Sequence, residues 1–129
     1  GGLRLYAEIV EILSGLPRLS RPDVLKLTNS LGGREAAPRF DLTVRLIDLA
    51  LARLARAGAM GQPLPEAAPG EAALQARLSP DARAARRWAE LAADLGARAR
   101  AGRAVNLDPG ALVLDMFLRL ESAARRAAG

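Results

Sequence analysis

The sequence of 129 residues contains no cysteine and no histidine. The chain therefore forms no disulfide and no zinc cluster, and it has neither a thiolate nucleophile nor a histidine general base. Aromatic side chains are few, so the sequence offers no interleaved platform for stacking single-stranded bases; they are Tyr6, Phe40, Trp88 and Phe117. No apolar run approaches the roughly 18–20 residues that cross a bilayer, and no signal-peptide pattern is present. We therefore expect a soluble, cytoplasmic domain.

Arginine dominates the charged residues: 18 of the 19 basic side chains are Arg, and the net charge is +5. A high Arg and Ala content with scarce Lys is also typical of a GC-rich genome. The high isoelectric point is therefore only weak evidence for nucleic-acid binding. The charge concentrates between Arg77 and Arg103. Six arginines there could form a track for nucleic-acid phosphates, with strongly salt-dependent binding; they are Arg83, Arg86, Arg87, Arg98, Arg100 and Arg103. A solvated helix face is the interpretation we favour.

The spacing of apolar residues predicts five helices, with Pro and Gly between them. Their expected ranges are 3–14, 20–31, 37–57, 80–100 and 109–127. Ser20 and Ser79 are the expected N-caps of the second and fourth helices, and Asp108-Pro109 marks the start of the last. Residues 58–79 are rich in Pro and Gly, which predicts an exposed connection with at most one short helical turn. No stretch alternates with period two, so we predict an all-α, five-helix bundle forming a single domain over residues 1–129.

The last predicted helix is unusually apolar, because Asp115 is the only polar residue between Ala111 and Leu118. Such a helix is buried on more than one side, either inside its own bundle or against a partner chain. The sequence leaves both options open. In the second case, Leu112, Met116 and Arg119 would form an exposed stripe at spacing i, i+4 and i+7.

Candidate reactive groups have simpler explanations. Gly32-Gly33 is not followed by Lys and Ser or Thr, so it is not a phosphate-binding loop. The carboxylates of Glu90 and Asp94 lie at helical spacing beside arginines, which is typical of solvated ion pairs. The serines have no histidine partner. We expect that this domain is not an enzyme and that it binds no cofactor or metal.

Two segments resemble a known family. Residues Ala104-Val105-Asn106-Leu107-Asp108-Pro109 are followed by Val113-Leu114-Asp115 and an apolar helix. This segment resembles the C-terminus of the delta-prime subunit of the bacterial DNA polymerase III clamp loader, in its alphaproteobacterial form. The opening Gly1-Gly2-Leu3-Arg4-Leu5-Tyr6 is similar to the family's transition from its ATPase-like module into its last domain.

The resemblance implies a helical collar domain, with an AAA+-type module expected upstream of residue 1 and absent here. In that family five collar domains pack in a ring, while the ATPase modules open the sliding clamp and place it on primed DNA. The parent would be a non-hydrolysing accessory subunit of a DNA-directed DNA polymerase, a nucleotidyltransferase. The implied partners are the gamma/tau and delta subunits, with DNA contacted only indirectly.

The resemblance carries no catalytic residue over to this chain. It implies an interface role for the turn Asn106-Leu107-Asp108 and for the closing helix. Two other functions remain open on the residues alone. One is an Arg-rich helical domain that binds nucleic acid, and the other is an effector-sensing domain with a pocket lined by Tyr6, Trp88 and Phe117.

Overall fold

A computed structural model describes residues 1–33 and 36–128, and these residues form six α-helices without a β-strand. The helices are α1 (Gly2–Leu13), α2 (Arg21–Asn29), α3 (Ala36–Met60), α4 (Glu71–Leu78), α5 (Ala82–Ala104) and α6 (Pro109–Ala128). The predicted all-α class is confirmed, and the five predicted helices lie within a few residues of α1, α2, α3, α5 and α6. The count of five is wrong, because α4 forms inside the segment predicted to be a connection.

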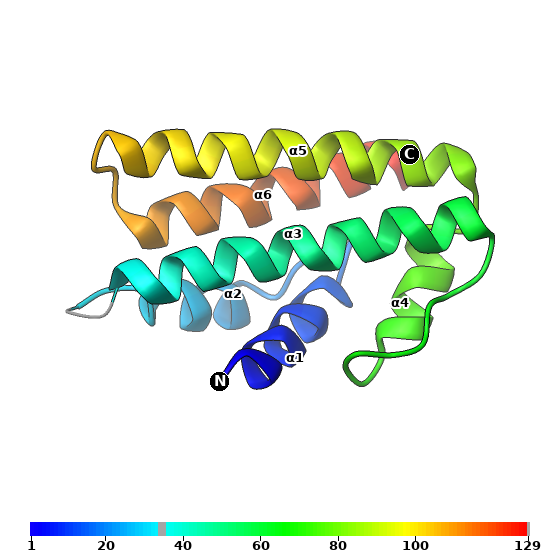
Figure 1. The fold of residues 1–129 in the computed structure, drawn as a ribbon, viewed down its shortest axis with the longest axis horizontal. Coiled ribbons are helices and arrows are strands. Elements are labelled where there is room, and N and C mark those ends of the chain that lie inside the picture. Colours follow the sequence, from blue (N-terminus) through cyan, green and yellow to red (C-terminus); the bar gives the residue numbers. More distant parts are fainter. Residues whose placement is uncertain (34–35, 129) are drawn as a thin grey trace.

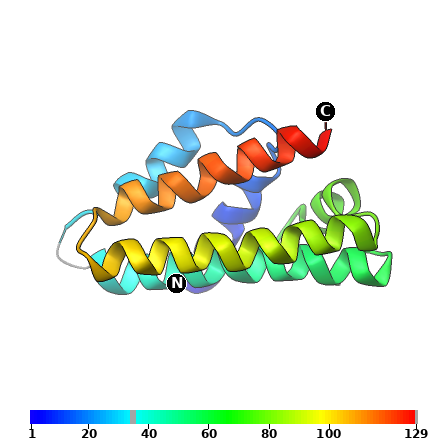
Figure 2. The same cartoon turned by 90° about the horizontal axis from the view of Figure 1, so that it is seen from above.

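Three long helices form the body of the domain. Figure 1 shows α3 and α5 running side by side in opposite directions, with α6 beside them and with α1, α2 and α4 on the lower side. Seen from above, α6 diverges from α5 and lies beside α2 (Figure 2). The core contains fully buried apolar side chains from several helices, among them Ile9, Leu13, Phe40, Ile47, Leu51, Leu95, Phe117 and Leu120. Tyr6 and Trp88 are also buried.

The end of α3 approaches the start of α5 closely because Gly58 has no side chain. A Cβ atom at Gly58 would lie 2.5 Å from Ser79 Oγ and 2.6 Å from Asp81 O. The helix predicted to end at residue 57 continues to Met60. Gly61 follows at φ 73°, a left-handed conformation that ends the helix at little cost for glycine.

The cap of α5 also differs from the sequence prediction. Ser79 does not cap the helix, because its hydroxyl donates to Leu54 O at 2.6 Å and is buried between α3 and α4. Asp81 is the N-cap instead, and its Oδ1 accepts the N–H of Ala84 at 2.9 Å. Ser20 caps α2 as predicted, accepting from the N–H of Asp23.

Residues 58–79 are only partly exposed, contrary to the predicted exposed connection. Leu64 and Ala68 are buried in the loop, and Leu74 is buried on α4. The N–H of Leu64 donates to Gln75 Oε1 at 2.8 Å, which fixes the loop against the helix. The segment therefore covers one end of α1 and α3, and it belongs to the core.

Glu71 joins three helices through a buried carboxylate that is only 1% exposed. It accepts hydrogen bonds from the Tyr6 hydroxyl of α1, from the Arg53 guanidinium of α3 at 2.9 and 3.0 Å, and from the Ala67 N–H. Burial alone would raise the pKa of Glu71, but the hydrogen bonds from Arg53, Tyr6 and Ala67 outweigh it and hold the pKa below its ordinary value. Burial and the neighbouring Glu71 raise the pKa of Tyr6. The ionised carboxylate is therefore part of the folded structure.

Replacing Glu71 with Gln should lower the free energy of unfolding by about 3 kcal/mol, because Arg53 loses its buried counter-charge. Since the folded pKa of Glu71 lies below the unfolded one, its contribution is complete above the unfolded pKa and is lost as pH falls through the folded pKa. Urea unfolding followed by circular dichroism should show a smaller loss of stability between about pH 5 and pH 3 in the variant than in the parent chain. The exposed Glu11→Gln is the control, and equal pH profiles for the Glu71 variant and the parent would contradict the assignment.

Candidate subunit interface

The turn between α5 and α6 is built by the residues that carry the family resemblance. Asn106 adopts φ 64°, and the N–H groups of Asn106 and Leu107 donate to the carbonyls of Arg103 and Gly102 at 3.0 Å. This is the Schellman arrangement for ending a helix, in which Asn is one of the few residues that tolerates the left-handed position. Asp108 then caps α6, since its Oδ2 accepts the Ala111 N–H at 2.9 Å. Asn106 and Asp108 therefore shape the turn, whereas the Leu107 side chain is 52% exposed.

The exposed face of α6 is not the predicted one. Leu112 and Met116 are only 9% and 1% exposed, so they belong to the core, and of the predicted stripe only Arg119 is exposed. Leu112 packs so closely on α5 that a Cβ at Gly102 would overlap its side chain. The large apolar residue that α6 exposes is Leu118, at 40%.

Helix α2 runs antiparallel to α6 and adds a second exposed leucine. Arg21 lies against Glu121 at one end of the pair, and at the other end Thr28 O lies 2.9 Å from the place of a Cβ at Gly110. With these contacts fixed, helical periodicity places Leu25 on the α6 side of α2, where it is 45% exposed.

The same periodicity places two leucines on the side of α6 that faces α2. We call these two, together with Leu25 and the exposed leucine of the turn, the α2–α6 strip: Leu25, Leu107, Leu114 and Leu118. Leu114 is half-buried and the other three are 40–52% exposed. Exposed large apolar side chains on neighbouring elements are typical of surfaces that a partner covers.

A buried carboxylate fixes α6 to the segment between α1 and α2. Glu121 is 5% exposed, and it accepts the Leu19 N–H at 2.7 Å and the Arg21 guanidinium at 2.8 Å. Burial would raise the pKa of Glu121, but these hydrogen bonds and the charges of Arg21 and Arg125 lower it below the ordinary value. Arg125 also donates to Pro17 O at 3.3 Å. Leu25, Leu114 and Leu118 therefore lie on two helices that these contacts hold together.

The six arginines of the possible nucleic-acid track do not share one face of α5. Arg98 pairs with Asp115 of α6 at 2.9 Å, and Arg100 pairs with Asp48 of α3 at 2.6 Å, on the other side of the helix. Arg103 donates to Leu107 O and stacks over the ring of Phe40 at 5.7 Å. The exposed remainder is Arg83, Arg86 and Arg87 near the start of α5. Three of the six arginines of this possible track are therefore engaged in contacts within the domain.

The possible effector pocket lined by Tyr6, Trp88 and Phe117 does not form. Phe117 is fully buried in the core, and the Tyr6 hydroxyl donates to the Glu71 carboxylate. Among the three, Trp88 alone lines a groove, which lies between α5 and α6.

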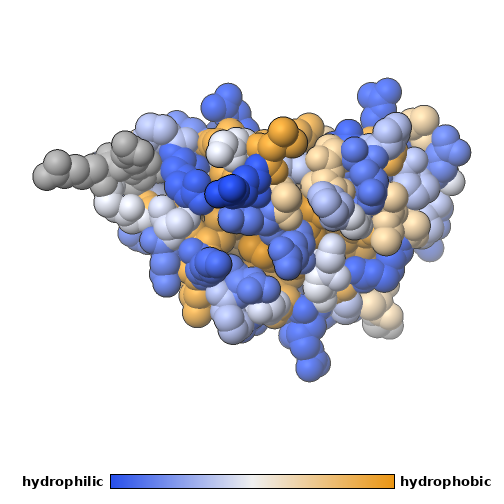
Figure 3. All heavy atoms as spheres, turned by 90° about the horizontal axis from the view of Figure 1, so that it is seen from below, coloured by the Kyte–Doolittle hydropathy of each residue, from blue (hydrophilic) through white to orange (hydrophobic). Residues whose placement is uncertain are grey.

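On the face seen in Figure 3, from below Figure 1, hydrophilic side chains interrupt the apolar areas. In residues 1–33 and 36–128, no group of three or more acidic side chains is arranged to hold a metal ion. The described helices also include none with the length and apolar content needed to cross a membrane.

No model of a known protein family matches the chain, and neither the curated proteins nor the solved structures give a significant match. The grounds for a functional proposal are therefore the geometry of the domain and the motifs in its sequence.

Two substitutions on α6 test whether Met116 lies on its buried face and Leu118 on its exposed face. Met116→Asp places a charge in the core and should unfold the domain, with a loss of more than about 4 kcal/mol. Leu118→Asp, two residues further on, should change the free energy of unfolding by less than about 1 kcal/mol, because the side chain is already partly in water. Far-ultraviolet circular dichroism with urea titration measures both. A folded Met116→Asp protein would show that this position is not core.

Proposed function

We propose that this domain is the collar domain of a clamp-loader delta-prime subunit of DNA polymerase III. In this role it packs against the gamma/tau and delta subunits in the cytoplasm, so that the assembled loader places the sliding clamp on primed DNA. The domain itself performs no chemistry and contacts DNA only through the assembly. Its contribution is a rigid helical surface for the neighbouring subunits.

The observation that carries the proposal is the α2–α6 strip next to the turn of residues 105–108. The turn and the helix that follows it are the part of the sequence that resembles the delta-prime family, and they present Leu107 and Leu118 to solvent. An apolar centre of this kind is what a stable contact between subunits needs.

Charged side chains at the edge of the strip fit the same role. Asp115 is held by Arg98 at 2.9 Å and by Arg119 at 3.1 Å, so both signs of charge lie beside the apolar leucines. Interfaces commonly have this arrangement, with an apolar centre and a polar rim. The rim selects the orientation of a partner, while the leucines supply most of the stabilisation.

Mixing the chain with collar-domain fragments of gamma/tau and delta tests the proposal. Light scattering on a sizing column should detect a stable complex of higher mass that persists at about 0.3 M salt, because an apolar contact is little affected by screening. A monomer that ignores both partners would overturn the proposal.

A pair of leucine variants tests the surface itself. Leu118→Glu should weaken the complex by more than roughly tenfold, because it places a charge in the apolar centre of the contact. Leu49→Glu is the matched control, since Leu49 is 47% exposed on α3, outside the strip. Equal binding by both variants would show that the partners use another face.

A further inference from the structure

Beyond Leu118, the outward face of α6 changes from apolar to basic. Helical periodicity places four residues in a row on one side of the helix: Leu114, Leu118, Glu121 and Arg125. The two leucines belong to the α2–α6 strip. Because Glu121 is buried, the leucines are followed at the surface by Arg125, whose side chain is 53% exposed.

Two further arginines join Arg125 at this end of the strip. Arg21 of α2 and Arg125 both approach the carboxylate of Glu121, at 2.8 and 3.7 Å, so their guanidinium groups lie around one buried group. The connection between α1 and α2 is held to the same part of α6, through Pro17 O and the Leu19 N–H. The residue between these two is an exposed arginine. We call the three arginines the basic cluster: Arg18, Arg21 and Arg125.

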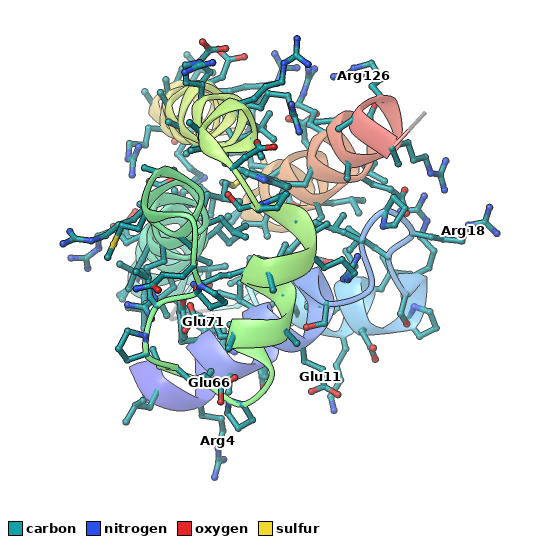
Figure 4. The ribbon with its side chains drawn as sticks, turned by 90° about the vertical axis from the view of Figure 1, so that its right-hand side faces the viewer. Arg4, Glu11, Arg18, Glu66, Glu71 and Arg126 are labelled. Carbon is teal, nitrogen blue, oxygen red and sulfur yellow. The ribbon has the colours of Figure 1, made fainter. Side chains whose placement is uncertain are left out.

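The basic cluster keeps a net positive charge, because a single carboxylate lies among three guanidinium groups. Glu121 is buried and already accepts hydrogen bonds from Arg21 and from the Leu19 N–H. Arg18 has no carboxylate within 4 Å in residues 1–33 and 36–128. Figure 4 shows Arg18 directed into solvent on the side of the molecule that holds α2 and the end of α6.

Other acidic side chains do not neutralise the cluster. The connection 14–20, α2 and α6 contain only two besides Glu121, namely Asp23 and Asp115. Asp23 follows Arg21 by two residues and so lies nearly opposite it on α2, where it lines a pocket on the α1 side of the helix. Asp115 is paired with two arginines at 2.9 and 3.1 Å. The charge at this end of the strip therefore favours an anionic group.

We propose that the subunit covering the α2–α6 strip places acidic side chains against the basic cluster, and that this attraction guides it onto the leucines. The inference rests on the proposed subunit contact and adds the chemistry that the partner carries at one end of it. Each exposed guanidinium can hold a carboxylate through two parallel hydrogen bonds.

The neighbouring leucines select a protein as the occupant. Leu118 and Arg125 lie on one face of α6, about 10 Å apart along the helix, so the ligand presents apolar and anionic groups side by side. A protein surface carries both kinds of group. A sugar–phosphate backbone supplies the charge, but it has no apolar side chain to cover Leu118.

Arg18→Glu tests the proposal, since this exposed side chain makes no ion pair that the substitution would break. At about 0.05 M salt the variant should associate with the gamma/tau or delta collar fragment roughly tenfold more slowly than the parent chain, with a similar dissociation rate, because peripheral charges act mainly on the encounter. At about 0.5 M salt the difference should shrink to less than about twofold, because salt screens the attraction. Surface plasmon resonance measures both rates.

Two further variants are matched controls. Arg4→Glu makes the same change of charge at an exposed arginine of α1, which Figure 4 shows well away from Arg18. It should slow association by less than about threefold, through net charge alone. Arg18→Lys keeps the charge and should associate at nearly the parental rate. Circular dichroism should show that all three variants fold like the parent chain.

Three results would overturn the inference. Equal association rates for Arg18→Glu and Arg4→Glu would show that the cluster does not guide the partner, while the subunit contact itself would stand. A parent chain that forms no complex with either fragment would overturn the proposed function and this inference with it. The third result is binding of a labelled single-stranded DNA of about 20 nucleotides that Arg18→Glu abolishes and Arg4→Glu does not, since the cluster would then be a phosphate site.

Discussion

The buried carboxylate of Glu71 is the interaction on which the lower half of the domain depends. It receives the Tyr6 hydroxyl, the Arg53 guanidinium and the Ala67 N–H at once, so one side chain connects α1, α3 and α4. A buried ion is tolerated only when its desolvation is compensated by such contacts. Arg77 and Ser79 add further hydrogen bonds from the end of α4, to Leu16 O and Leu54 O.

A second buried carboxylate, Glu121, determines the shape of the upper half. It holds α6 to the segment between α1 and α2, while Leu112 holds the other end of α6 to α5. Because α6 is fixed to different neighbours at its two ends, it lies at an angle to α5. The α2–α6 strip and the groove both follow from this angle, one on each side of α6.

The sequence predicted the helices well and their exposed faces poorly. Helix positions follow from Pro, Gly and capping residues, which act locally, so the bounds could be found within a few residues. The segment 58–79 was misjudged because the buried state of Glu71 depends on Tyr6 and Arg53, which are distant in sequence. On α6, nearly every residue from 111 to 118 is apolar, so periodicity could not distinguish the buried Met116 from the exposed Leu118. Faces of such helices are decided by tertiary contacts.

The position of α6 in the chain has a consequence for how the protein forms in the cell. This helix of 20 residues follows all of its packing partners in sequence, and it covers apolar side chains of α2, α3 and α5. A ribosome adds about 5–20 residues per second, so those side chains remain uncovered for about 1–4 seconds while α6 is synthesised. During that interval the nascent chain exposes its future core. Chaperone binding and aggregation should therefore compete with folding most strongly just before α6 emerges.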